Sequence, residues 1–202
     1  MTDPLESALR QAASALPTPE FDLEAAEASS LIDVAYARHD SPVGTLVVAA
    51  TARGLVRVAY ADDDGGIEAA LAALARSVSP RVLAAPRRLD GVRRELDEYF
   101  AGTRERFDLA LDWRLTHGFG RRVLRSTAKI PYGSVSSYGQ IAAAAGSPRG
   151  SRAAGNALGA NPLPIVVPCH RVLHSGGGLG GYTGGVERKL TLLTIERGAG
   201  PE

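Results

Sequence analysis

Short runs rich in hydrophobic residues, many of them β-branched, dominate the first part of the chain and predict β-strands. The runs are LIDVAYARH (31–39), TLVVAAT (45–51) and LVRVAY (55–60). Gly- and Pro-containing segments, SPVG (41–44) and ARG (52–54), separate them and favour turns. Short strands joined by short turns are typical of an antiparallel meander.

Helical spacing of hydrophobic residues follows this meander. IEAALAALARSV (67–78) and LDGVRRELDEYF (89–100) have that spacing, and each is followed by a strand-like run, near 81–84 and at ERFDLALDW (105–113). Gly102 suits the position just after the second helix, where a left-handed residue ends many helices. This part of the chain therefore predicts a small domain of mixed sheet and helix.

The second part of the chain predicts short helices separated by tight turns. GRRVLRSTAKI (120–130) has helical spacing, and SSYGQIAAAA (136–145) predicts a helix capped by Ser136 or Ser137. The Gly-Ser-Pro turn at 146–148 precedes a further helix, GSRAAGNALGA (150–160). Two short helices joined by such a turn are typical of a helix-turn-helix.

The last part predicts an extended segment, a glycine-rich turn and the helix VERKLTLLTIER (186–197). Residues 176–181 satisfy G-x-G-x-x-G, but residues 182–185 separate them from the helix and no βαβ unit surrounds them. A dinucleotide site is therefore excluded. We expect a hairpin that forms a wing beside the helix-turn-helix.

The expected fold class is α+β, with three segments. Residues 1–30 predict a helix that starts at Asp3-Pro4 and ends near Pro17, followed by an acidic linker of unassigned role. Residues 31–113 form the small N-terminal mixed sheet-and-helix domain. Residues 114–202 form a winged-helix-like C-terminal domain that contains the helix-turn-helix.

Composition narrows the class of protein. A hydrophobic fraction of 45% and a charged fraction of 22% in 202 residues indicate a folded, soluble chain. One cysteine forms no internal disulfide and no multi-cysteine zinc site, so we expect no metal site and a reducing, cytoplasmic setting. The N-terminus has no secretory signal and no run reaches membrane-spanning length, so no membrane is expected as a partner.

Charge is distributed unevenly along the chain. Residues 1–112 hold 12 basic and 19 acidic residues, a net charge of −7, whereas residues 113–202 hold 11 basic and 3 acidic residues, a net charge of +8. The second part is therefore suited to a polyanion such as nucleic acid, and the alternative is that the two parts attract each other.

The single cysteine, Cys169, lies between Pro168 and two residues that can carry positive charge, His170 and Arg171. Positive charge stabilises a thiolate, so we expect the pKa of this thiol to lie below its usual value of about 8.5. On an extended backbone Cys169 and His170 point to opposite faces, so a water would have to connect them. Glu187 or Glu196 would orient the imidazole from behind.

Four segments in fixed order carry a resemblance to a known family. They are IPYGSVSSYGQIA (130–142), SRAAGNALGANP (151–162), PIVVPCHRV (164–172) and GYTGG (181–185). From about Phe119 to Glu196 the chain resembles the O6-alkylguanine-DNA alkyltransferases, also called methylated-DNA–protein-cysteine methyltransferases. Residues 31–112 resemble the N-terminal domain of that family more loosely.

The resemblance implies a catalytic role for five residues. Cys169 is similar to the alkyl acceptor, and His170 to the base that acts through water. Glu196 matches the carboxylate that holds this histidine, and Asn161 the asparagine that braces the turn before the cysteine. Tyr138 resembles the tyrosine that donates a hydrogen bond to the departing base.

The resemblance also implies residues that contact DNA and the flipped base. Arg152 matches the arginine that fills the space of the extruded nucleotide, and Tyr182 and Thr183 resemble loop contacts over the flipped base. The backbone carbonyls of Cys169 and Val172 resemble acceptors for the guanine amino group. Further contacts are expected from the same segments: Ser151, Tyr138 and Asn156 for DNA, and Gly184 for the base. Arg171 is expected to pin the active-site segment rather than to bind phosphate.

The implied function is direct-reversal repair of alkylated guanine in double-stranded DNA. A thiolate would displace the base from the alkyl group after base flipping and keep the alkyl group as a thioether, so each monomer would act once without a cofactor. O4-alkylthymine is a further candidate substrate, and the protein would lie in the cytoplasm or on the nucleoid. The alternatives are a damage sensor without transfer, whose known relatives replace the acceptor cysteine, and a thiol-responsive regulator.

Overall fold

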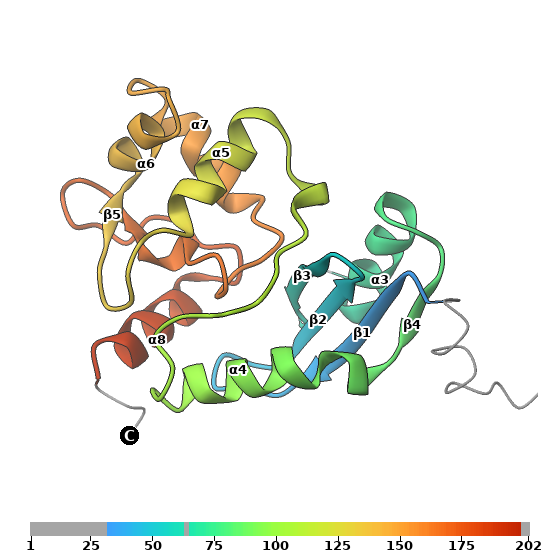
Figure 1. Ribbon diagram of the computed structural model, residues 1–202. Coiled ribbons are helices and arrows are strands. Elements are labelled where there is room, and N and C mark those ends of the chain that lie inside the picture. Colours follow the sequence, from blue (N-terminus) through green and yellow to red (C-terminus); the bar gives the residue numbers. More distant parts are fainter. Residues whose placement is uncertain (1–31, 63–64, 199–202) are drawn as a thin grey trace, which may run out of the picture. The chain divides into compact units, whose positions relative to one another are not determined.

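The computed structural model describes residues 32–62 and 65–198 (Figure 1). The N-terminal helix and acidic linker expected over residues 1–30 lie outside the described residues. The described residues belong to one compact unit that begins at Ile32. Within them no helix has the length and apolar character needed to cross a membrane.

The N-terminal half is built on a four-stranded sheet with the order β3-β2-β1-β4. Strands β1 (Val34–His39), β2 (Leu46–Thr51) and β3 (Gly54–Tyr60) form the predicted antiparallel meander. The short strand β4 (Val82–Ala84) was also predicted, and it pairs parallel with β1.

Helices cover both faces of this sheet because successive strand residues point to opposite sides. On one face α3 (Gly66–Ser77) packs Leu74 against Val34 and Val56. On the other face a 3-10 turn (Pro86–Leu89) leads into α4 (Asp90–Phe100), whose side chains join the main core. Gly102 follows this helix with a φ of 71°, as predicted for its left-handed position.

The strand predicted at 105–113 is wrong. The segment forms only one bridge to the sheet, between Leu111 and Leu55, with Leu55 N donating to Ala110 O over 2.8 Å. Its alternating pattern has another cause: Phe107, Leu109 and Leu111 pack against the main core from one side. One-sided packing of an extended segment gives the same pattern as a half-buried strand.

The C-terminal half consists of short helices around two very short strands. In chain order these are α5 (Gly118–Thr127), β5 (Ser136–Ser137), α6 (Tyr138–Ala144), α7 (Ser151–Gly159), a 3-10 turn (Cys169–Arg171), β6 (Val172–Leu173) and α8 (Val186–Glu196). Helices α6 and α7 form the predicted helix-turn-helix, and α5 packs on α7 (Figure 1).

Ser137 is the residue that caps α6. Its hydroxyl accepts from Gln140 N over 3.2 Å, and the Gln140 side chain accepts from Ser137 N over 2.8 Å. This reciprocal pair satisfies two backbone donors at the start of the helix. The cap fixes where Tyr138, the first residue of α6, enters the site.

The wing expected at the glycine-rich run is not a hairpin of strands. Strand β6 pairs parallel with β5, and a tight turn follows in which His174 N donates to Gly178 O over 2.8 Å. Gly180, with a φ of 66°, lies against the Tyr138 side chain so closely that a Cβ would overlap the hydroxyl. The glycines therefore let the loop lie on Tyr138 instead of extending into a return strand.

One hydrophobic core runs through both halves of the described unit. It joins Leu46 and Val58 of the sheet to Val123, Ile141 and Leu192 of the C-terminal helices. A backbone hydrogen bond of 2.9 Å from Val58 N to Pro162 O ties β3 to the segment before the cysteine. The sheet therefore supports the segment that carries the thiol.

Candidate active site

Cys169 opens a 3-10 turn at the end of a buried segment. Val167 N donates to Leu163 O and Cys169 N donates to Val167 O, each over 2.8 Å. Ile165 has a φ of 73°, a value that a β-branched residue adopts only when its surroundings enforce it. The extended backbone assumed for Cys169 and His170 is therefore wrong, because the chain turns there.

Asn161 braces this turn and also contacts the thiol. Its Nδ2 donates to Val167 O over 2.9 Å and to Cys169 Sγ over 3.2 Å, and its Oδ1 accepts from Leu163 N over 3.0 Å. The side chain is buried, so all three contacts are shielded from water. The structure thus places the predicted bracing residue on both the backbone and the sulfur.

A buried carboxylate gathers four donors behind the cysteine. Glu196 accepts from His170 Nε2 and from Tyr99 OH, each over 2.7 Å, from Arg171 over 2.8 Å and from Gly133 N over 3.3 Å. Burial alone would raise the pKa of this carboxyl, but the hydrogen bonds from His170 and Arg171 outweigh it and lower the pKa to about 2. Glu196 is therefore ionised at neutral pH, and Glu187 is not the orienting residue.

His170 faces this carboxylate with one ring nitrogen and keeps the other free. Burial lowers the pKa of the imidazole below its usual value despite the nearby Glu196, so the ring is neutral at pH 7. An ionised carboxylate requires a donor, so Nε2 carries the proton and Nδ1 is the basic nitrogen. Within the described residues Nδ1 is buried and has no hydrogen-bond partner, and thus remains available as a base.

Arg171 holds the site together through buried contacts and supplies no free positive charge to the thiol. Its guanidinium is buried, pairs with Glu196 over 2.8 Å and donates to Ile130 O over 2.6 Å. These contacts match the expected pinning role and leave it no access to a phosphate.

The expected low pKa of the thiol is wrong. Burial raises the pKa of Cys169 to about 11, and the Asn161 hydrogen bond and the Lys189 charge offset this only in part. Neither neighbour supplies the expected positive charge, because Arg171 is paired with the Glu196 carboxylate and His170 is uncharged. In the resting site the thiol is protonated, so any reaction through the thiolate needs a base.

Lys189 is a buried charged residue of the site, and its charge acts on the Cys169 thiol; the sequence reading missed it. Its side chain is fully buried, and Nζ donates to Val172 O over 2.8 Å and to Leu179 O. The spacing of residues in α8 could have indicated its burial. Lys189 and Glu196 fall in the same helical stripe as the buried Leu192 and Leu193. Charged residues in a buried stripe indicate a site, since burial of an unpaired charge is costly.

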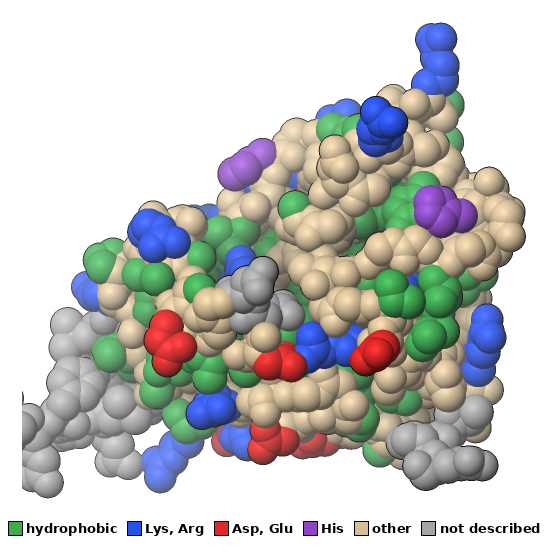
Figure 2. Space-filling model, turned by 180° about the vertical axis from the view of Figure 1, so that it is seen from behind, with side chains coloured by type: hydrophobic (Ala, Val, Ile, Leu, Met, Phe, Trp, Pro, Cys, Tyr) green, Lys and Arg blue, Asp and Glu red, His purple; other side chains and the backbone are tan. Residues whose placement is uncertain are grey.

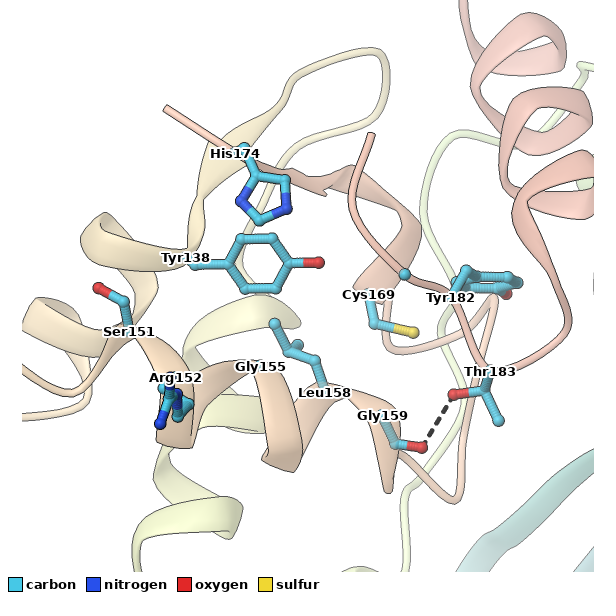
Figure 3. A pocket seen from close by; sticks show the side chains of 11 residues that line it. Tyr138, Ser151, Arg152, Gly155, Leu158, Gly159, Cys169, His174, Tyr182 and Thr183 are labelled. Atoms are coloured by element: carbon cyan, nitrogen blue, oxygen red, sulfur yellow. Dashed lines mark hydrogen bonds between the residues drawn. The ribbon is translucent and has the colours of Figure 1, made fainter. Parts of the chain in front are cut away.

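The cysteine lies at a cavity of about 560 Å³ (Figure 3). Helix α7 lines one wall with Arg152 and Leu158, Tyr138 lies on another side, and Tyr182 and Thr183 lie beyond the sulfur. A cavity with a nucleophile, aromatic walls and few polar groups is typical of a site for a flat organic ligand.

Tyr138 is held as a phenol at this cavity. Its ring packs on His174 with centroids 5.1 Å apart, a contact that the sequence did not predict. Burial, together with the charge of an ionised Cys169, raises the pKa of the Tyr138 hydroxyl. It is therefore protonated at neutral pH and able to donate a hydrogen bond into the cavity.

The structure brings most of the remaining predicted residues to the cavity and leaves three away from it. Ser151 lines the cavity beside Arg152, and Thr183 Oγ1 donates to Gly159 O over 3.0 Å. Three of the predicted residues lie outside this lining. Asn156 is exposed on α7, and Gly184 packs against the Tyr60 ring. Val172 is buried, and its carbonyl oxygen accepts a hydrogen bond from Lys189. The Val172 carbonyl oxygen has two lone pairs and Lys189 uses one, so its expected role as an acceptor for the guanine amino group stays a prediction.

The part of the chain that surrounds the cavity is strongly basic. Residues 113–186 contain eight Lys and Arg residues and no Asp or Glu. In Figure 2 the upper part of the face, over the helices of the C-terminal half, shows basic and no acidic side chains, whereas acidic side chains appear lower in the view. Such a surface attracts a polyanion without repelling it locally.

A buried cysteine backed by a His–Glu pair, at a cavity beside a helix-turn-helix, fits the class of DNA-binding proteins that react through a thiol. Comparison with family models identifies both halves: residues 34–113 match the 6-O-methylguanine DNA methyltransferase ribonuclease-like domain, and residues 118–198 match the DNA binding domain of the same family.

Individual relatives agree with these matches. The methylated-DNA–protein-cysteine methyltransferase of Mycolicibacterium paratuberculosis is 50% identical over 116 residues, which is 57% of this chain and 70% of the relative. The protein of that name from Methanosarcina acetivorans is 35% identical over 161 residues, covering 80% of this chain and 97% of the relative. The crystal structure of Mycobacterium tuberculosis OGT in complex with DNA is similar with a TM-score of 0.71 and 36% identity, covering 83% of this chain and 95% of that one.

The chain therefore belongs to the methylated-DNA–protein-cysteine methyltransferase family, and its C-terminal half is a DNA-binding domain.

Proposed function

We propose that this protein repairs alkylated DNA by direct reversal, transferring the alkyl group of O6-alkylguanine in duplex DNA to Cys169. One observation carries the proposal: Cys169 lies at a cavity of about 560 Å³ beside the helix-turn-helix, with the buried His170–Glu196 pair behind it. The thiol is a soft nucleophile suited to attack at carbon, and the cavity accommodates a flat base.

The first step is removal of the thiol proton. Burial keeps the thiol protonated, so a base must act, and Nδ1 of His170 is the free basic nitrogen. A water between Sγ and Nδ1 passes the proton to the imidazole. Glu196 then stabilises the imidazolium, because its carboxylate is already ionised and lies 2.7 Å from Nε2.

The second step is displacement at the alkyl carbon. The bond between Sγ and that carbon forms as the bond between the carbon and guanine O6 breaks, and the electron pair of the broken bond stays on the guanine. Tyr138, held as a phenol, donates to the departing guanine and offsets its negative charge. The thioether on Cys169 is not reversed by cellular thiols, so each molecule acts once.

Access to O6 requires that the base leave the duplex, at a cost of a few kcal/mol. Arg152 projects from the second helix of the helix-turn-helix at the cavity and is the side chain placed to fill the gap in the stack. We extend the proposal to the setting: the protein acts as a monomer in the cytoplasm and on the nucleoid. A damage sensor without transfer is disfavoured because the acceptor thiol and its base are both present.

The test is intact-protein mass after incubation with a duplex that contains one O6-methylguanine. We expect a gain of one methylene equivalent, located on Cys169 by peptide mapping, with no more than one transfer per molecule. Cys169→Ser should bind the duplex and gain no mass, and a duplex with unmodified guanine should leave the mass unchanged. Repeated turnover, or transfer by the Cys169→Ser variant, would rule out the proposed chemistry.

A further inference from the structure

We propose that Tyr60, at the end of the edge strand β3 of the N-terminal sheet, is a positioning residue for the loop of Tyr182, Thr183 and Gly184, here called the substrate loop. Through a hydrogen bond between two phenol hydroxyls it holds Tyr182 in the wall of the cavity and thereby sets the affinity for the flipped alkylated base. The inference rests on the proposed alkyl transfer and assigns a specificity role to a residue far from the cysteine in the sequence.

The contact that carries this inference joins the two halves of the chain. Tyr60 OH and Tyr182 OH lie 2.7 Å apart, and their ring centroids are 6.3 Å apart at an angle of 69°. Tyr182 lines the cavity that contains Cys169, and its ring meets the His170 ring edge-on at 6.4 Å. Tyr60 therefore contacts an aromatic side chain that faces both the ligand space and the proposed catalytic base.

Tyr60 is itself held firmly. Its side chain is buried at the end of β3, and the Arg188 guanidinium lies 4.3 Å from its ring centroid. Arg188 in turn donates to Val43 O over 2.7 Å and to Gly184 O over 3.0 Å, and it pairs with Asp62 over 2.5 Å. A side chain fixed by these neighbours can fix Tyr182.

Gly184 adds a steric reason for the arrangement. A Cβ at this position would overlap the Tyr60 ring, so the substrate loop passes directly against Tyr60. The loop residues Tyr182 and Thr183 line the cavity just before this point. The position of the Tyr60 ring therefore determines how closely the loop approaches the sheet.

The hydrogen bond also decides which part of Tyr182 meets the ligand. Burial, followed by the charge of an ionised Cys169, raises the pKa of the Tyr182 hydroxyl, so it is a neutral phenol. Because this hydroxyl pairs with Tyr60, Tyr182 presents its ring rather than a polar group to a base in the cavity. A fixed ring loses little freedom when a base packs on it, which favours binding.

The test uses the full-length protein and free O6-benzylguanine, a substrate that needs no base flipping. Inactivation rates over a range of concentrations give a half-saturation concentration and a limiting rate. Tyr60→Phe keeps the ring and removes the hydroxyl. We expect the half-saturation concentration to rise roughly three- to tenfold, because one buried hydrogen bond is lost. The limiting rate should stay within about twofold of wild type.

A double-variant comparison separates this role from a general effect on folding. Tyr182→Phe removes the same hydrogen bond from the other side, so Tyr60→Phe should add no further change in that background. Tyr36→Phe, on the opposite face of the sheet, is the control and should behave as wild type. If Tyr60→Phe is poorly folded, the Tyr182→Phe variant alone must still raise the half-saturation concentration.

The outcomes are distinct. If Tyr60→Phe and wild type have the same half-saturation concentration, or if the two substitutions act additively, the positioning role is wrong although alkyl transfer stands. A lower limiting rate together with slower alkylation of the thiol by iodoacetamide would indicate damage to the nucleophile and overturn it as well. If wild-type protein fails to react with both O6-benzylguanine and O6-methylguanine DNA, the proposed function and this inference fall together.

Discussion

The Nε2 atom of His170 lies 2.7 Å from Oε1 of Glu196, and both side chains are buried. This contact fixes the tautomer of the imidazole, because an ionised carboxylate can only accept. Tyr99, on the helix beside the N-terminal sheet, donates to the same oxygen over 2.7 Å. The His170 imidazole is therefore oriented by a carboxylate that is held by groups from both halves of the chain.

Acid stability should depend on Glu196. Its pKa is lowered from 4.5 to about 2 in the folded protein, so its contribution to stability is complete above pH 4.5 and is lost as the pH falls toward 2. The shift corresponds to on the order of 3 kcal/mol. Urea unfolding between pH 6 and pH 3 should therefore show a smaller pH dependence for Glu196→Gln than for wild type.

Glu187→Gln serves as the matched control for this measurement. Glu187 is exposed in the first turn of the same helix, so its removal should leave the pH dependence unchanged. An equal pH dependence in wild type and Glu196→Gln would contradict the charged, hydrogen-bonded state assigned to Glu196.

The resting thiol should react slowly with small electrophiles at neutral pH. Because burial raises the pKa of Cys169 to about 11, the thiolate fraction at pH 7 should be roughly two to three orders of magnitude below that of an ordinary cysteine. The rate of alkylation by iodoacetamide should still be rising steeply at about pH 10. A free cysteine peptide, measured in parallel, should reach half of its maximal rate near about pH 8.5 and level off by about pH 10, and a half-maximal rate for the protein at or below that of the peptide would show that the thiolate is stabilised.

Much of the fold could be predicted because its signals are local. The capping pair around Ser137, the turn before α7 and the left-handed Gly102 all depend on residues close in sequence. The segment 105–113 was misread because one-sided packing against the core produces the same alternation as strand pairing. Periodicity reports which side is buried and not which partner buries it.

The chemistry of the site was harder to predict because charges are set by distant partners. Arg171 adjoins the cysteine in sequence, yet its charge is directed to Glu196, 25 residues further along. Lys189 and Tyr60 reach the site only through folding, Lys189 from α8 and Tyr60 from the sheet. The identities of Cys169, His170 and Glu196 were predicted through the family resemblance, whereas the protonation state of the thiol required the burial that only the structure gives.

DNA affinity should fall steeply with salt, because the region around the cavity carries basic and no acidic residues over 113–186. A plot of log affinity against log salt should have a slope of about −0.9 per phosphate neutralised. Arg149, exposed in the turn between α6 and α7, should account for about one such unit, so Arg149→Ala should make the slope less steep by about 0.9.

Arg53→Ala is the control for this slope. Arg53 is exposed between β2 and β3 of the N-terminal sheet, outside the helix-turn-helix segment, and its removal should leave the slope unchanged. Affinity that does not respond to salt, or an equal change in the two variants, would argue against docking through the helix-turn-helix.

The role of Arg152 can be separated from the chemistry. It is exposed on α7 and lines the cavity, and no ion pair holds it among the described residues. If Arg152 keeps the flipped nucleotide out of the stack, its loss restores an unstacking cost of a few kcal/mol, which corresponds to roughly tens- to hundreds-fold in rate. Arg152→Ala should therefore slow repair of O6-methylguanine in duplex DNA by about that factor, while the rate with free O6-benzylguanine changes by less than about twofold.

Arg149→Ala, which removes an equal charge outside the cavity, should weaken DNA binding without this selective loss. Equal losses on the duplex and on the free base would mean that Arg152 supports the fold or the thiol, and no change on either substrate would mean that another residue holds the nucleotide out.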